Sequence, residues 1–95
     1  MSNDITTTEL KGLIPKIKII DIRDNYQFNL GSIPTSINIP MNFLLTNPDS
    51  YLNKSDTYYI YCEYGSRSKT TCNELQKKGY KVINVLGGFK EYKLK

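Results

Sequence analysis

The sequence predicts an α/β fold in which a parallel sheet carries helices on both faces. β-branched and apolar segments alternate along the chain with segments of helical pattern, as in βαβ units. The two clearest strands, residues 17–22 and 57–61, are largely β-branched or aromatic, which is typical of strands buried on both faces. The length of 95 residues and the 39% hydrophobic content fit one globular domain over residues 1–95.

The first elements are marked by a helix cap and a proline. Thr6 and Glu9 have the spacing of a capping box, which predicts a helix from Thr6 to about Leu13. Pro15 ends this helix, because proline is excluded from helix interiors. The strand over residues 17–22 follows.

The middle of the chain contains only short elements. Asp24 is a candidate N-cap for a helical turn through Phe28. Residues 37–39 lie between two prolines and have room only for a very short strand. Residues 41–45 have a helical pattern, and residues 47–49 have the composition of a turn.

The last third of the chain has the order strand, helix, strand, helix. A helix over residues 67–78 follows the strand at residues 57–61, and Gly79 suits the position just after its end. The expected inner face of this helix consists of Ser68, Cys72, Leu75 and Gly79. Residues 82–86 are predicted to be a strand, and residues 89–94 a short helix.

The chain contains no histidine. This excludes Ser-His-Asp triads, Cys-His pairs and histidine metal sites, so catalysis would have to use Cys, Lys, Arg, Tyr, Asp or Glu. Residues 62–95 carry 8 basic and 3 acidic side chains, against 5 basic and 6 acidic in residues 1–61. This basic segment favours anionic ligands. Because the lysines are scattered and no groove-reading motif is present, we expect no nucleic-acid partner.

Cysteine content and hydropathy indicate the cellular compartment. Two cysteines are too few for a disulfide framework. No apolar run approaches the ~20 residues of a membrane span, and the first residues lack the features of a signal peptide. We therefore expect a cytoplasmic protein with free thiols, no membrane association, no metal ion and no cofactor.

Cys62 is the candidate nucleophile because of its place in the chain. It follows a buried strand and precedes a helix that begins near Arg67, and parallel sheets bind ligands at the carboxyl ends of their strands. Gly65 lets the loop between them curl so that several N–H groups point at one centre. These groups, the helix N-terminus and Arg67 would stabilise a thiolate without an imidazole. The alternative is that Cys62 is an inert buried cysteine.

Three stretches, in the right order, resemble signatures of the rhodanese family of sulfurtransferases. The first comprises Asp21-Ile22-Arg23, Gly31-Ser32-Ile33-Pro34 and Asn38-Ile39-Pro40. The second, Cys62-Glu63-Tyr64-Gly65-Ser66-Arg67-Ser68, is similar to the active-site loop C-x-x-G-x-R-S of that family. The third is Gly87-Gly88-Phe89 with Tyr92.

The resemblance implies a doubly wound α/β domain with a five-stranded, mostly parallel sheet. It also implies that the Cys62 thiolate takes a sulfane sulfur from a small anionic donor such as thiosulfate. The resulting persulfide would pass its sulfur to cyanide or a thiol, or to a sulfur-relay protein. The loop residues expected to hold the persulfide are Glu63, Tyr64, Gly65, Ser66, Arg67 and Ser68, with Asp21 and Arg23 in support.

Several alternatives remain open at the level of sequence. Arg67 either orients an anionic donor or braces the loop by pairing with Asp21 or Glu63, and Arg23 is expected to pair with Asp24 or another acid. Ser32 stands where the family usually has histidine, which puts substrate preference in question. The chain could instead be a non-catalytic module or a protein-to-protein sulfur carrier. A phosphatase or arsenate reductase is less favoured, because their related loops are one residue longer.

Overall fold

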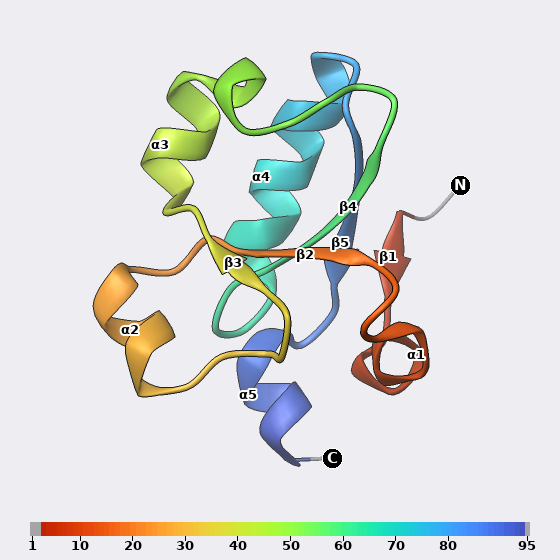
Figure 1. The fold of residues 1–95 in the computed structure, drawn as a ribbon, viewed down its shortest axis with the longest axis vertical. Coiled ribbons are helices and arrows are strands. Elements are labelled where there is room, and N and C mark those ends of the chain that lie inside the picture. Colours follow the sequence, from red (N-terminus) through yellow and green to blue (C-terminus); the bar gives the residue numbers. More distant parts are fainter. Residues whose placement is uncertain (1–2, 95) are drawn as a thin grey trace.

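The computed structural model describes residues 3–94 and contains a five-stranded sheet flanked by helices (Figure 1). The strands are β1 (Asp4–Ile5), β2 (Lys18–Asp21), β3 (Ile37–Asn38), β4 (Thr57–Tyr61) and β5 (Lys81–Val85). Their order across the sheet is β1-β5-β4-β2-β3, and each neighbouring pair is parallel. The predicted α/β class is therefore confirmed, and so is the five-stranded parallel sheet that the resemblance implied.

The helices begin and end close to the predicted positions. They are α1 (Thr7–Leu13), α2 (Asn25–Leu30), α3 (Met41–Thr46), α4 (Ser66–Lys77) and α5 (Gly88–Leu94). The capping box forms, since the Glu9 amide donates to Thr6 Oγ1 at 3.1 Å and the Thr6 amide to Glu9 Oε1 at 3.0 Å. Gly79, with φ of 95°, follows α4, and the Tyr80 amide donates back to the Leu75 carbonyl at 3.1 Å.

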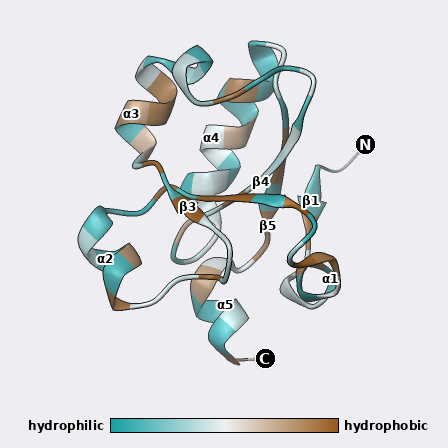
Figure 2. Ribbon diagram, viewed as in Figure 1, coloured by the Kyte–Doolittle hydropathy of each residue, from teal (hydrophilic) through white to brown (hydrophobic). Residues whose placement is uncertain are grey.

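Helices cover both faces of the sheet, so the core has two layers. On one face, Leu44 of α3 and Leu75 of α4 pack against strand residues such as Ile60. On the other face, Leu10 of α1 and Phe89 of α5 pack against a second set of strand residues. Figure 2 shows hydrophobic colouring on β5 and α3 and hydrophilic colouring on most of α2. This two-sided cover is the doubly wound arrangement that was expected.

The structure differs from the sequence-based expectations in several local details. β1 was not predicted, because two residues are too short to show a strand pattern. Asp24 occupies the N-cap position of α2, but within the described residues its side chain makes no capping hydrogen bond. Gly79 is exposed after the end of α4, and Thr71 is buried on the inner face instead. The turn predicted at residues 47–49 overlaps a short 3-10 helix over residues 48–50.

The order of the strands places the ends of β2 and β4 side by side. From β2 the chain continues to β3 on one side and afterwards to β4 and β5 on the other, so the winding direction changes between β2 and β4. Ligands of open α/β sheets bind at such a switch point, outside the carboxyl ends of the strands. Residues 22–23, after β2, and Cys62, after β4, therefore lie next to the expected binding position.

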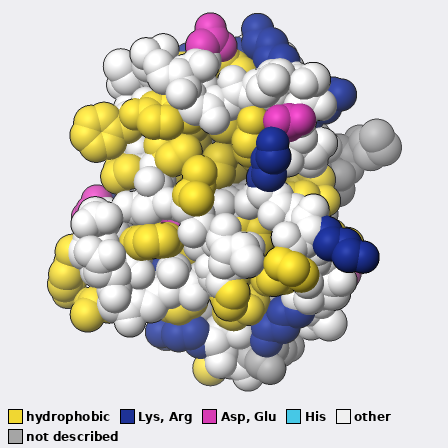
Figure 3. Space-filling view, in the orientation of Figure 1, with side chains coloured by type: hydrophobic (Ala, Val, Ile, Leu, Met, Phe, Trp, Pro, Cys, Tyr) yellow, Lys and Arg dark blue, Asp and Glu magenta, His cyan; other side chains and the backbone are white. Residues whose placement is uncertain are grey.

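The outer surface carries separate apolar side chains as well. The face that bears α3 and β3 shows several hydrophobic groups (Figure 3). Phe43 of α3 and Ile37 of β3 are more than half exposed. Among residues 3–94, no helix has the length and apolar character needed to cross a membrane.

Candidate active site

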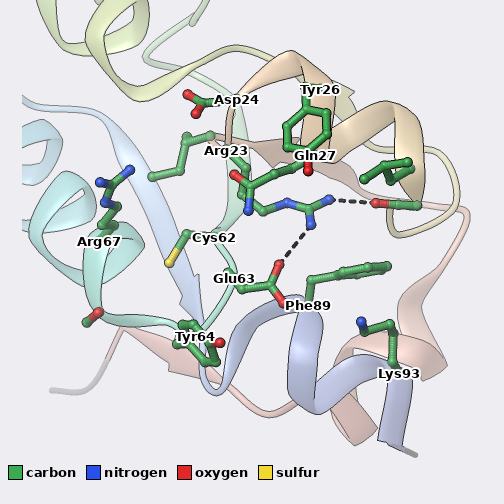
Figure 4. Close-up of a pocket in the computed structure, with 14 residues that line it drawn as sticks. Arg23, Asp24, Tyr26, Gln27, Cys62, Glu63, Tyr64, Arg67, Phe89 and Lys93 are labelled. Carbon is green, nitrogen blue, oxygen red and sulfur yellow. Dashed lines mark hydrogen bonds and ion pairs between the residues drawn. The ribbon is translucent and has the colours of Figure 1, made fainter.

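A cavity of about 860 Å³ opens at the switch point between β2 and β4. Its walls come from α2, the loop after β4, the start of α4, and α5 (Figure 4). Cys62 lies at its base and is only 3% exposed. The predicted nucleophile thus belongs to the buried cluster beneath α4 and also lines the floor of the cavity.

Two backbone amides converge on the Cys62 sulfur. The amides of Gly65 and Ser68 donate to Sγ at 3.1 and 3.3 Å, and the thiol lies 3.3 Å from Ser68 Oγ, to which it can donate. Gly65 makes this curl possible, because its φ of 98° lies in the left-handed region and a Cβ there would come within 2.9 Å of the Gly87 nitrogen. Amides aimed at sulfur stabilise an anion there.

The first turn of α4 provides further donors beside the cavity. Ser66 and Arg67 line the cavity, and their amides donate to no acceptor in residues 3–94. Unpaired first-turn amides and the positive end of a twelve-residue helix both favour an anionic ligand. The site can therefore accommodate negative charge next to Cys62 as well as on it.

Arg23 connects the end of β2 to this loop. It is 5% exposed and donates to both carboxylate oxygens of Asp21, which is fully buried, at 2.7 to 3.1 Å. It also donates to Glu63 Oε1 at 2.9 Å and to the Gly31 carbonyl at 2.6 Å (Figure 4). Burial alone would lower the pKa of the guanidinium, but the hydrogen bonds and charge of Asp21 and the hydrogen bond to Glu63 raise it. Its Cζ atom lies 4.5 Å from the Phe89 ring centre.

The two possible roles of Arg67 are distinguished by these contacts. Asp21 and Glu63, the acids with which Arg67 could have braced the loop, are both bound by Arg23. Arg67 itself is exposed, lines the cavity and forms no ion pair within residues 3–94. It is therefore placed to contact a ligand. Glu63 also lines the cavity, but its carboxylate is paired with Arg23.

The other predicted residues divide into rim, floor and core. Tyr64 is 66% exposed and lies at the rim, as expected. Ser68 is fully buried beneath the sulfur. Cys72 lies in the core, where burial raises the pKa of its thiol to about 12. Among residues 3–94, Ser32 is not one of those that line the cavity.

One buried residue at the site was not anticipated. Asn84 of β5 is 1% exposed and accepts a short hydrogen bond from the Ser68 hydroxyl group. The only signal in the sequence was a polar residue inside the apolar strand pattern Lys-Val-Ile-Asn-Val. That signal does not reveal which partner the amide would meet.

Residues 6–95 match the family model described as the rhodanese-like domain. The chain belongs to this family. Among curated relatives, YtwF of Bacillus subtilis, provisionally named a sulfurtransferase, is 32% identical over 88 residues, which cover 90% of this chain and 84% of YtwF. The tRNA sulfurtransferase of Thermoplasma acidophilum is 37% identical over 75 residues, but these cover 78% of this chain and only 15% of that protein.

Two crystal structures are similar to this rhodanese-like chain over almost their whole length. SSP1007 of Staphylococcus saprophyticus has a TM-score of 0.87 at 37% identity, covering 97% of this chain and 93% of that one. A rhodanese-like domain protein of Staphylococcus aureus has a TM-score of 0.86 at 35% identity, covering 97% and 91%. The predicted family and fold are thus confirmed, while the roles of individual site residues remain predictions.

Proposed function

We propose that this rhodanese-like protein is a sulfurtransferase in which Cys62 carries the transferred sulfur as a persulfide. The observation that supports the proposal most is the convergence of the Gly65 and Ser68 amides on Cys62 Sγ at the base of a cavity. A thiolate is the reactive form of cysteine, and preoriented amides stabilise it without a proton acceptor. The reaction therefore needs no histidine.

The proposed first half-reaction uses an inorganic donor. The Cys62 thiolate attacks the outer sulfur of thiosulfate, a bond forms between Sγ and that sulfur, and sulfite leaves with the electron pair of the broken S–S bond. The terminal sulfur of the persulfide then carries the negative charge. The unpaired amides of Ser66 and Arg67 support this step, since they lie beside the cavity and can donate to that sulfur.

The second half-reaction returns the enzyme to its starting state. Cyanide or a thiolate attacks the terminal sulfur and leaves as thiocyanate or as an organic persulfide, and the electron pair of the broken bond remains on Cys62 Sγ. No external oxidant or reductant is required. The cavity of about 860 Å³ is in the range of pockets for organic ligands and leaves room for a thiol larger than cyanide.

A sulfur-relay carrier is the second candidate function. The cavity is bordered by exposed apolar side chains, Tyr26 at 71%, Leu30 at 75% and Tyr64 at 66%, which could contact a protein partner. One relative is named the adenylyltransferase and sulfurtransferase uba4 of Ogataea parapolymorpha, and the match covers 19% of that protein. Both candidates need a reduced Cys62, so the proposal assigns the protein to a reducing compartment such as the cytoplasm.

Turnover with two donors tests the proposal. Thiocyanate formation is measured with cyanide as the acceptor and with either thiosulfate or a cysteine desulfurase plus cysteine as the donor. We expect activity in wild type and in Cys72→Ala, because the thiol that this variant lacks lies in the core. We expect no activity in Cys62→Ser. Faster thiocyanate formation with thiosulfate supports a thiosulfate sulfurtransferase. Faster formation with the desulfurase supports a sulfur-relay carrier. Activity that survives in Cys62→Ser, or no activity with either donor, contradicts the proposal.

A further inference from the structure

We infer that Asn84 controls how readily Cys62 ionises, because it competes with the Cys62 sulfur for the single hydrogen of the Ser68 hydroxyl group. Asn84 is then a positioning residue that acts through Ser68. The inference rests on the proposed function only in taking Cys62 as the reactive thiol, and it goes beyond it by assigning a role to a residue on a different strand.

The contacts around Ser68 carry this inference. Ser68 Oγ lies next to three groups that can accept a hydrogen bond from it: Asn84 Oδ1 at short range, the Gly65 carbonyl at 3.1 Å, and Cys62 Sγ at 3.3 Å. A hydroxyl group has one hydrogen and can satisfy one of them well at a time. Ser68 is fully buried and Asn84 is 1% exposed, so bulk water cannot supply the missing donor.

In the neutral state these groups form a directed chain. The Cys62 thiol donates to Ser68 Oγ, and the Ser68 hydroxyl donates to Asn84 Oδ1. Asn84 thereby orients a lone pair of Ser68 toward the sulfur. This arrangement stabilises the protonated thiol, because the thiol hydrogen has a well-placed acceptor.

Ionisation of Cys62 reverses the requirement. The amides of Gly65 and Ser68 already donate to the sulfur, but the contact between Sγ and Ser68 Oγ has lost its hydrogen. The thiolate is stabilised further when the Ser68 hydroxyl turns toward sulfur and gives up its bond to Asn84. A buried acceptor that loses its donor is destabilised. Once sulfur is loaded, the charge lies on the terminal sulfur, Sγ is neutral, and the hydroxyl can return to Asn84. The Asn84 carbonyl oxygen therefore opposes the thiolate and is compatible with the persulfide.

The place of Asn84 in the sheet makes the polar side chain informative. Alternate residues of a strand share a face, so Asn84 lies on the same face of β5 as Val82, which packs in the apolar layer beneath α4. An apolar residue at this position would avoid the cost of burying an amide. The hydrogen bond between Asn84 and Ser68 instead links this buried amide to Cys62.

Other ionisable groups also lie near Cys62. Those with charge at the cavity are Arg23, Asp24, Glu63, Arg67 and Lys93. The neutral titratable ones are Tyr26 and Tyr64 at the cavity and Cys72 in the core. Substituting Asn84 leaves all of these side chains in place, so a difference between Asn84 variants reports on the network with Ser68.

The test is the pH dependence of Cys62 alkylation by iodoacetamide, followed by intact mass in a Cys72→Ala background. The thiolate displaces iodide, and no sulfur donor is involved. In Asn84→Leu the neutral Gly65 carbonyl, at 3.1 Å, is the remaining competitor for the hydroxyl, and an anionic sulfur is the stronger acceptor. We therefore expect the midpoint of the pH profile to fall by about one pH unit, the size of one hydrogen bond to a charged group. In Asn84→Asp the stronger, anionic acceptor should raise the midpoint.

Three comparisons make the test specific. The fall in Asn84→Leu should disappear when Ser68→Ala is added, because no hydroxyl remains to be released. Val82→Ala, on the same face of β5, should leave the midpoint unchanged although it damages the core. If Asn84→Leu does not fold, Asn84→Ala removes the same acceptor with a smaller side chain. An unchanged or raised midpoint in the folded variant would overturn the inference, whether or not the protein transfers sulfur.

Discussion

The guanidinium of Arg23 lies 2.9 Å from the carboxylate of Glu63, the residue directly after Cys62. This ion pair joins the end of β2 to the loop after β4, across 40 positions in the sequence. The same loop is held from the other side, where the amides of Phe89 and Lys90 donate to the Cys62 and Glu63 carbonyls at 2.9 and 3.0 Å. The nucleophile therefore lies on a loop fixed at both sides, and Arg67 remains unpaired at the cavity.

Removal of the Arg23 side-chain charge should destabilise the fold. In Arg23→Met the carboxylate of Asp21, which is fully buried, loses its cationic partner, and we expect the free energy of unfolding to fall by ~3–5 kcal/mol. Glu63→Gln should cost only about 1 kcal/mol, because the amide can still accept from Arg23 and the side chain is 27% exposed. Urea denaturation measures both. Equal losses in the two variants would show that the buried pair is not the dominant contact.

Arg67→Gln should weaken binding of the sulfur donor without destabilising the fold. Since Arg67 forms no ion pair within residues 3–94, its loss should change the free energy of unfolding by less than about 0.5 kcal/mol. Loss of a charged contact to thiosulfate should raise KM by about tenfold. Lys77→Gln is the matched control, because it makes the same charge change at the far end of α4. If Arg67→Gln mainly lowers stability, Arg67 braces the loop after all.

Gly88→Ala should distort the loop that carries the nucleophile. A Cβ at Gly88, where φ is 62°, would lie 2.6 Å from the Glu63 carbonyl oxygen and would also collide with that of Cys62. We expect a loss of ~1–3 kcal/mol in stability and slow sulfur loading. At Gly12 of α1 a Cβ would meet nothing within 4 Å, so Gly12→Ala should stabilise the helix slightly and leave loading unchanged. Similar behaviour of the two variants would contradict this assignment.

Cys72 should make stability fall at alkaline pH. Burial raises the pKa of its thiol from 9.0 to about 12, so between these values the unfolded chain loses a proton that the folded chain keeps. The free energy of unfolding should therefore decrease as the pH rises above 9.0, by up to ~1.4 kcal/mol per pH unit from this thiol. The slope should be smaller in Cys72→Ala. Equal slopes in both proteins would mean that Cys72 ionises as readily folded as unfolded.

Local patterns determined how much of the fold could be predicted. The strand Thr57–Tyr61 was located at its observed ends, because β-branched and aromatic residues fill it completely. The capping box fixed the start of α1 for a similarly local reason. β1 was missed because its two residues pair with β5, which lies about eighty positions away and leaves no local pattern.

The candidate site was predictable only in part for the same reason. Cys62, Gly65 and Ser68 lie within one loop, and their mutual contacts follow from its short sequence. The partners of Arg23 could not be assigned, because the neighbouring Asp24 was as plausible as the distant Glu63. Asn84 reaches Ser68 across 16 positions through the packing of α4 on β5, which no sequence pattern encodes.

The most direct test of the account is the intact mass of the protein after incubation with a sulfur donor. We expect Cys72→Ala to gain one sulfur atom from thiosulfate or from a cysteine desulfurase with cysteine, and to lose it on addition of cyanide. Cys62→Ser should gain none under the same conditions. A sulfur adduct that persists in Cys62→Ser, or the absence of any adduct on the protein that retains Cys62, would contradict the assignment of Cys62 as the persulfide carrier.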